Sequence, residues 1–223
     1  MGNERKSNQS GFTLIELAVV LVIIGIILGA VLKGQELINS SKVKKVQSDI
    51  HSMETMMLNY YDRKGRWPGD CNLDGNVGFT LPNNSVATAL NAVATDPSAI
   101  SCEATSPVEN QDTAFADLRA AGVAPRSTTN ASLGKHVLDG AYNIGYTRDT
   151  ATGATANAIV AYGIPSWMAK MIDVATDGAE NGKSGRVRRW DQLDSGINGG
   201  TWPLSTADST PVALVYFYDR TLP

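Results

Sequence analysis

The sequence predicts an α+β fold in which a long N-terminal helix packs on a head built around an antiparallel sheet. The first half of the helix is expected to span a membrane, and the second half is amphipathic. Three observations favour this fold: an apolar run near the N-terminus, a stripe of apolar residues at helical spacing after it, and short β-rich stretches separated by turns. The 223 residues suffice for one ordinary domain with an extension.

The apolar run covers residues 12–32, of which 17 are apolar. A helix of this length rises about 31 Å, which is enough to cross the hydrocarbon core of a bilayer. The mean hydropathy of the whole chain is nevertheless −0.13, so the rest of the chain has the composition of a water-soluble protein. This asymmetry argues against a wholly cytosolic enzyme and against a multi-span transporter. The net charge of −3 argues against nucleic acid as a general partner.

Glu16 is a carboxylate inside this apolar run. At bilayer depth it costs about 2.5–3.5 kcal/mol, and residues 12–32 contain no Lys, Arg or His to pair with it. A cut between Gly11 and Phe12 would create an α-amine partner, and would leave Glu16 in the first turns of a helix, where the dipole favours negative charge. A removed secretory signal and a simple anchor are alternatives. The run is longer than the apolar region of a signal, and an anchor does not account for Glu16.

Residues 11–17, GFTLIEL, together with the apolar run resemble the N-terminal motif of type IV pilins and type II secretion pseudopilins. The resemblance implies cleavage after Gly11 by a prepilin peptidase in the inner membrane and N-methylation of Phe12. It also implies that Glu16 pairs with the N-terminal amine of a neighbouring subunit during filament assembly. The fold is then expected to be pilin-like, with the head in the periplasm before assembly into a pilus or pseudopilus.

Within the apolar run, Gly25 and Gly29 form a small-xxx-small pair that permits close helix approach in lipid, although glycines are common in membrane helices. Beyond the run, an apolar stripe indicates that the helix continues. The stripe favours packing against the chain's own head, and a coiled-coil seam is the alternative. Its members are Val43, Val46, Ile50, Met53, Met57 and Tyr60.

The helix is expected to stop at Gly65, with Pro68 beyond it. The predicted organisation is a leader over residues 1–11, a helix over 12–64 with its transmembrane segment at 12–32, and a head over 65–223. In the head, the pattern predicts helices at 85–95, 109–121 and 166–174. It predicts strands at 141–147, 158–163, 185–190 and 212–218.

Cys71 and Cys102 lie outside the apolar run, and an even, sparse count in a chain with an export-like N-terminus predicts one disulfide. Two unrelated buried thiols are the alternative. Nearby, Asp70, Asn72 and Asp74 fit positions 1, 3 and 5 of a Ca²⁺ loop. Position 12 is Leu81 instead of Glu, so a turn of self-bonding Asp and Asn side chains is the alternative. The sequence indicates no cofactor other than this Ca²⁺.

Two further charged groups surround a Gly-rich segment late in the chain. The acidic group comprises Asp173, Asp177, Glu180 and Asp191, and is read as a helix end running into a solvated loop. The basic group comprises Lys183, Arg186, Arg188 and Arg189, and suggests DNA or another anion, with a charged strand as the alternative. No Ser-His-acid signature, P-loop, Rossmann fingerprint or zinc spacing occurs around the two histidines, so the sequence does not indicate an enzyme.

The sequence thus predicts a structural subunit of a type IV pilus or pseudopilus. Its expected partners are a prepilin peptidase, the inner membrane and other pilin or pseudopilin subunits in a homo- or hetero-polymer. Cleavage would leave 223 − 11 = 212 residues, which favours a minor subunit over a major one. The alternative function is a pilus-tip or competence subunit whose head binds DNA, a surface or a secreted substrate.

Overall fold

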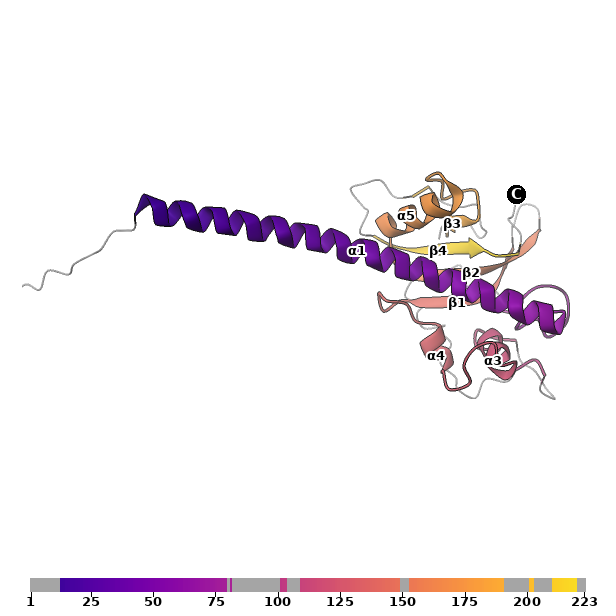
Figure 1. The fold of residues 1–223 in the computed structure, drawn as a ribbon. Helices are drawn as coiled ribbons and strands as arrows, with labels where there is room; N and C mark the ends of the chain where they lie inside the picture. Colours follow the sequence, from indigo (N-terminus) through magenta and orange to yellow (C-terminus); the bar gives the residue numbers. More distant parts are fainter. Residues whose placement is uncertain are drawn as a thin grey trace, which may run out of the picture. The chain divides into compact units, whose positions relative to one another are not determined.

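The computed structural model describes residues 13–79, 81, 101–103, 109–148, 153–190, 201–202 and 210–219. The chain divides into two compact units, residues 1–42 and 43–223, and each is described by itself. The described elements follow the order α1, α3, α4, β1, β2, α5, β3 and β4. Together they form an α+β architecture with a long apolar N-terminal helix and an antiparallel sheet, as the sequence predicted (Figure 1).

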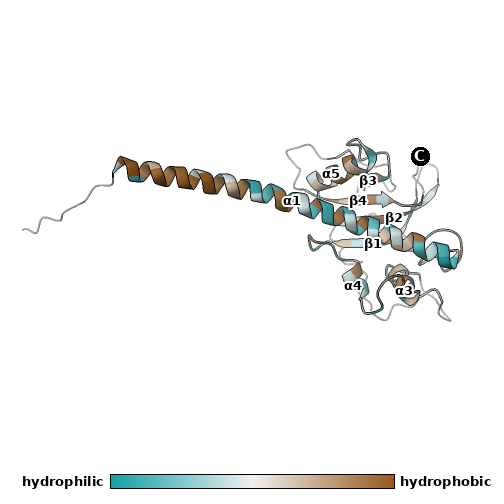
Figure 2. Cartoon of the chain, viewed as in Figure 1, coloured by the Kyte–Doolittle hydropathy of each residue, from teal (hydrophilic) through white to brown (hydrophobic). Residues whose placement is uncertain are grey.

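Helix α1 runs over Leu14–Lys64. The first part of α1 is hydrophobic and is coloured brown in Figure 2. Hydrophilic (teal) and hydrophobic (brown) residues alternate along the later part of the helix. The helix ends where the sequence predicted, at Gly65, which has a positive φ of 69° and donates its N–H to the carbonyl of Tyr61. Arg63 and Lys64 lie in the last turn, where the helix dipole favours positive charge.

The second unit contains a four-stranded sheet in the order β1-β2-β4-β3, and every neighbouring pair is antiparallel. The strands are β1 at Ala141–Arg148, β2 at Thr155–Pro165, β3 at Val187–Arg189 and β4 at Pro211–Phe217. Each overlaps one predicted strand. β3 is shorter than predicted because pairing with β4 covers only residues 187–189. β2 is longer because its N-terminal residues pair with the end of β1.

The core of the second unit forms where the head half of α1 meets one face of the sheet. All six residues of the predicted stripe are buried, from Val43 to Tyr60. They pack in one cluster with the sheet residues Tyr142, Ile144 and Leu214. Packing against the chain's own head is therefore confirmed over the coiled-coil alternative. The opposite face of the sheet is also buried, at Val160, Val215 and their neighbours.

Three shorter helices complete the described head: α3 at Thr113–Ala120, α4 at Asn130–Leu133 and α5 at Ser166–Asp177. α3 is shorter than predicted because residues 109–112 form turns ahead of its N-cap, Asp112. α5 continues to Asp177 and ends at Gly178, which adopts the left-handed conformation. α4 was not predicted, and the helix predicted at 85–95 lies outside the described residues.

Candidate functional site

Helix α1 begins with a reciprocal pair of hydrogen bonds between Thr13 and Glu16. The backbone N–H and the hydroxyl of Thr13 both donate to Oε2 of Glu16, each at 2.8 Å. The backbone N–H of Glu16 faces the Thr13 hydroxyl at 3.4 Å. This arrangement is a capping box, which satisfies N–H groups that the first turn of a helix leaves unpaired. Glu16 is therefore held over the N-terminal end of α1, where the helix dipole favours its negative charge.

The predicted processing site, Gly11 and Phe12, lies outside the described residues. Beside Glu16, the apolar side chains of Ile15, Val19 and Val20 line a shallow hollow. All three side chains are at least half exposed. The N-terminal end of α1 thus presents an acid surrounded by accessible apolar surface.

The apolar half of α1 is exposed throughout. Within the described part of the chain, α1 is the helix that is long and apolar enough to cross a membrane, and its most apolar window has no buried residue. A Cβ added at Gly25 or Gly29 would meet no heavy atom within 4 Å. The small-xxx-small pair therefore lies on an open surface, and its predicted role in helix packing stays a prediction.

The head half of α1 is attached to the sheet through Glu54. Its carboxylate accepts hydrogen bonds from Arg186 Nη2 at 2.6 Å and from the Tyr216 hydroxyl at 2.7 Å. His51 lies one turn earlier on α1, and its Nδ1 is 3.3 Å from Oε2 of Glu54. Burial by itself would raise the pKa of Glu54, but the bonds from Tyr216, Arg186 and His51 outweigh it and lower the pKa. Arg186 also stacks over the Tyr216 ring at 4.8 Å. A charged network thus fastens α1 to β4.

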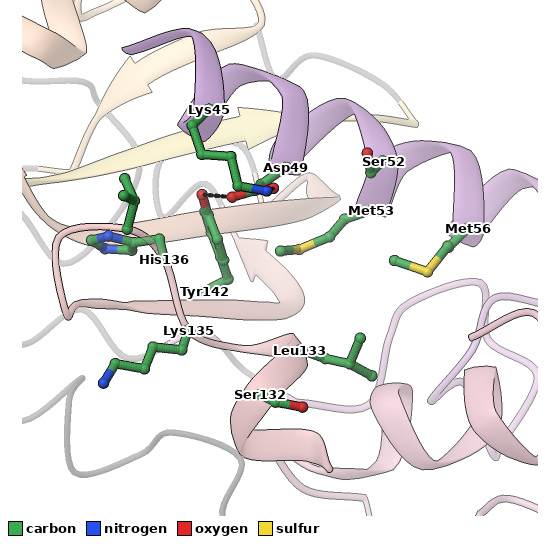
Figure 3. Close-up of a pocket in the computed structure, with 11 residues that line it drawn as sticks. Lys45, Asp49, Ser52, Met53, Met56, Ser132, Leu133, Lys135, His136 and Tyr142 are labelled. Carbon is green, nitrogen blue, oxygen red and sulfur yellow. Dashed lines mark hydrogen bonds and ion pairs between the residues drawn. The ribbon is translucent and has the colours of Figure 1, made fainter. Parts of the chain in front are cut away.

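A groove of about 560 Å³ separates α1 from the segment that leads into β1 (Figure 3). Met53 and Met56 of α1 and Leu133 of α4 contribute its apolar surface. The hydroxyl of Tyr142 donates to Asp49 across the groove at a long 3.5 Å. Lys45 and Lys135 also line it, and both side chains are more than half exposed.

Comparisons with known proteins agree with the N-terminal geometry. Residues 6–32 match the family model described as the prokaryotic N-terminal methylation motif. The chain is also similar to the toxin coregulated pilin of Vibrio cholerae serotype O1, with 30% identity over 86 residues. Both matches make the chain similar to type IV pilins over part of its length. The match covers 38% of each protein, so the chain spans well under half the length of the pilin that it matches. No solved structure matches the chain significantly.

The head carries the predicted disulfide, which joins Cys71 and Cys102. Asp117 of α3 lies beside it and is buried. Its carboxylate accepts from Arg66 Nη1, from the backbone N–H of Gly69 and from the backbone N–H of Cys102, each at 2.9 Å. One side chain therefore fixes the turn after α1 and one end of the disulfide to α3.

The predicted Ca²⁺ loop is folded by its own side chains. Asp70 is buried and accepts hydrogen bonds from the backbone N–H groups of Asp74 and Gly75, both at 3.1 Å. Asn72 Oδ1 accepts from the N–H of Asp74, and Asn72 Nδ2 donates to its carboxylate. These bonds are those of a turn of self-bonding Asp and Asn side chains, which the sequence offered as the alternative to a Ca²⁺ loop. It uses the same oxygens that a cation would need, and Ca²⁺ binding stays a prediction.

The buried and half-buried acids at the end of α5 bind backbone and side-chain N–H groups of the head. Asp177 accepts from the N–H groups of Arg186 and Val187, which fixes the start of β3. Asp173 is buried and accepts from Trp202 Nε1 and from the N–H of Asn181. Burial raises the pKa of Asp173, and these two bonds oppose the rise. Asp191, the last member of the acidic group, lies outside the described residues.

The three arginines of the basic group also have partners within the head. Arg186 bonds to Glu54 and to the carbonyl of Phe217, and Arg189 donates to the carbonyl of Thr201. Arg188 is buried, and its guanidinium lies over the Phe217 ring. These contacts match the charged-strand interpretation. Lys183, the fourth member of this group, is exposed.

The histidines lie apart and serve different contacts. His51 is half exposed beside Glu54 on α1. His136 is buried, with Nε2 2.7 Å from the carbonyl of Tyr162 and Nδ1 accepting from the N–H of Leu138. Burial lowers the pKa of His136, which favours the neutral ring. His136 therefore acts as a bridge between the segment before β1 and β2.

Sequence reasoning missed several residues that organise the head. Asn157 of β2 joins three segments: Oδ1 accepts from the N–H of Val77, and Nδ2 donates to the carbonyl of Gly75 and to Asp219. Asp117 and Glu54 were missed in the same way. A single acid or amide carries no spacing pattern of its own. For Asp117 and Glu54 the available signal was a polar residue inside a predicted helix, whereas Asn157 lies one residue ahead of a predicted strand.

Proposed function

We propose that this chain is a structural, non-enzymatic subunit of a type IV pilus or of a type II secretion pseudopilus. In this proposal a prepilin peptidase of the inner membrane cleaves after Gly11 and methylates Phe12. The mature chain stays anchored by the apolar half of α1, with its head in the periplasm, until it joins a filament. The division into leader, helix and head over 1–11, 12–64 and 65–223 belongs to the same proposal.

The observation that carries the proposal is an exposed apolar helix that begins with a capped acid. A bare anchor has no use for Glu16, whereas assembly gives it a partner in the α-amine of the next subunit. The exposed apolar surface of α1 can be buried only in lipid or against other helices. The match to the methylation motif and the similarity to a pilin support the same conclusion.

The finer proposal is a minor subunit that polymerises with itself or with other pilins. It rests on size, since cleavage would leave at least 212 residues, obtained as 223 − 11. The binding alternative receives little support from the arginines of the late loop, since they are engaged within the head.

Processing is tested by intact mass and N-terminal peptide analysis of the chain from its own host. The expected product begins with methylated Phe12. A chain that begins at Met1, or one cut near Ala30, would contradict the proposal.

Assembly is tested with two matched variants, Glu16→Ala and Thr13→Ala. Glu16→Ala removes both the cap and the acid, and is expected to leave processing largely intact while abolishing sedimentable filaments. Thr13→Ala removes the hydroxyl of the cap and keeps the acid, so filaments should still form. Normal filaments from Glu16→Ala would contradict the pairing role. Equal loss in both variants would assign the effect of Glu16 to the helix cap.

A further inference from the structure

We infer that Asp173 and Asp177 share one proton, and that this proton makes the attachment of the α5–β3 segment to α5 depend on pH. The α5–β3 segment is defined here as residues 178–186, between the end of α5 and the start of β3. All of these residues belong to the head, so the inference goes beyond the proposed function and stands independently of it.

The two acids bind the same stretch of chain. Asp173 Oδ2 accepts a hydrogen bond from the backbone N–H of Asn181 at 2.7 Å. Asp177, one turn later on α5, accepts from the N–H of Arg186 at 3.1 Å and from the N–H of Val187 at 2.8 Å. Residues four apart lie on the same face of a helix, so both carboxylates meet the α5–β3 segment on one side of α5.

These contacts leave one oxygen of Asp173 without a partner. The residue is 0% exposed, and its Oδ2 takes the bonds from Asn181 and from Trp202 Nε1. Within the described part of the chain, its Oδ1 is buried and has no hydrogen-bond partner. Such an oxygen is costly in a carboxylate, because it has lost water and gained no donor. A proton on Oδ1 turns the oxygen into a donor, and Asp177 is the acceptor within hydrogen-bond reach.

The electrostatics of the pair also favour one shared proton. Burial raises the pKa of Asp173, and the bonds from Trp202 and Asn181 oppose this rise. The negative charge of Asp177 raises the pKa of Asp173 further. Two carboxylates at hydrogen-bond distance repel each other when both are ionised, so one of them keeps a proton to a higher pH than an ordinary aspartate does.

The charged groups that face the pair from other elements do not remove this repulsion. Arg186 interacts with Asp177, but its guanidinium bonds to Glu54 of α1 at 2.6 Å. Tyr216 of β4 also interacts with Asp177, and it donates its hydroxyl to Glu54. If both acids of the pair were ionised, three carboxylates would share the positive charge of Arg186.

Two lysines stand near the same end of α5. Lys170 lies 3.4 Å from Glu180, so that acid offsets part of its charge. Lys183 is exposed on the α5–β3 segment, where water and salt screen its charge. The buried Asp173 is therefore neutralised by a proton more effectively than by either lysine.

The shared proton couples pH to the attachment of α1. Asp177 fixes the N–H of Arg186, and the Arg186 side chain binds Glu54 on α1. The pKa of Asp173 is raised in the folded chain. Its stabilisation is therefore complete below the ordinary pKa near 3.8 and is lost as the pH rises through the folded pKa. The α5–β3 segment is thus held more firmly in acid than in alkaline solution.

The test compares the melting temperatures of the full chain and of Asp173→Asn at pH 4 and pH 8, in detergent with EDTA. Asparagine can keep an oxygen toward Asn181 and place an N–H where the proton would lie, so it imitates the protonated state at every pH. The two chains should melt within about 2 °C of each other at pH 4, and the variant should melt about 3–8 °C higher at pH 8. Other titrating groups, such as His136, are present in both chains and cancel in the comparison.

Two further variants sharpen the test. Asp62→Asn makes the same change of charge at an exposed position of α1, and should melt within about 2 °C of the unsubstituted chain at both pH values. Trp202→Phe keeps an aromatic ring and removes a donor that stabilises the ionised form of Asp173. It should therefore move the loss of stability to higher pH. A loss that stayed in place or moved to lower pH would overturn the inference, even if Asp173→Asn did not fold.

The proton itself has a spectroscopic signature. An infrared difference spectrum between the unsubstituted chain and Asp173→Asn at pH 5 should contain the C=O band of a protonated carboxyl, since an ordinary aspartate is ionised there. A lower melting temperature of Asp173→Asn at both pH values would show that Asp173 acts as an ionised acceptor, and would overturn the inference. A rise in the melting temperature of the unsubstituted chain with Ca²⁺ in place of EDTA, absent in Asp173→Asn, would assign a cation to the pair and overturn the shared proton.

Discussion

Replacing Asp117 by alanine should destabilise the head more than any exposed substitution. The change removes one carboxylate that accepts from Arg66, Gly69 and Cys102 at 2.9 Å each. The Asp117 side chain is fully buried and that of Arg66 is 12% exposed, so water cannot replace the lost contacts freely. Breaking a buried ion pair by removing one partner costs about 3–5 kcal/mol.

The other contacts of this network determine where the loss of stability falls within that range. Two backbone N–H groups would lose their acceptor, at about 1–3 kcal/mol each if they stay dry. Arg66 keeps weaker bonds to the carbonyls of Trp67 and Asp70, so its charge is not stranded. Since such costs are not additive within one network, we expect a total of about 3–5 kcal/mol. For a folded unit of this size the loss corresponds to a fall in melting temperature of about 6–20 °C.

The measurement is thermal unfolding of the full chain in detergent, followed by near-ultraviolet circular dichroism under non-reducing conditions. Asp62→Ala is the matched control, because Asp62 is an exposed acid on the same helix that leads to Arg66. It should melt within about 2 °C of the unsubstituted chain. If Asp117→Ala also melted within that margin, the reasoning from its buried contacts would be refuted.

Three other predictions concern the same head. Replacing both Cys71 and Cys102 by serine should remove about 3.5–4 kcal/mol, because the disulfide closes a separation of 31 residues, and denaturant unfolding measures the loss. Burial lowers the pKa of His136 in the folded chain. The neutral ring therefore makes its full contribution to the stability of the fold above the unfolded pKa near 6.5, and this stabilisation is lost as the pH falls below that value. Melting temperatures from pH 7 to pH 5 should therefore fall less in His136→Gln. Ca²⁺ should raise the melting temperature and EDTA should lower it if Asp70, Asn72 and Asp74 bind the ion; no shift with either reagent would remove that site.

The parts of the fold that follow a repeated pattern were predictable. The stripe from Val43 to Tyr60 has helical spacing, and every member is buried. β4 was predicted from a run of β-branched and aromatic residues, and it pairs on both sides within the sheet. In both cases several residues carry the same signal, so an error at one position does not change the result.

The parts that depend on one residue were not predictable. α4 has four residues and begins with a capping box between Thr129 and Ser132, which is too short to show a helical period. Asp117 and Asn157 take their roles from segments far away in the sequence. The Asp70 loop shows a related limit, since the same oxygens and spacing fit a cation site and a self-bonded turn.

The capping box changes the argument about Glu16. The sequence argument treated the carboxylate as an acid without a partner at bilayer depth, yet both donors of Thr13 bond to its Oε2 within the same chain. Hydrogen bonds from neutral donors reduce the desolvation cost of a carboxylate, but they do not cancel its charge. In the proposed assembly a cation is therefore still required, and the cap places the carboxylate that would meet it over the end of α1. We propose that Thr13 prepares the acid for an amine that arrives at the helix N-terminus, which is where cleavage after Gly11 would supply one.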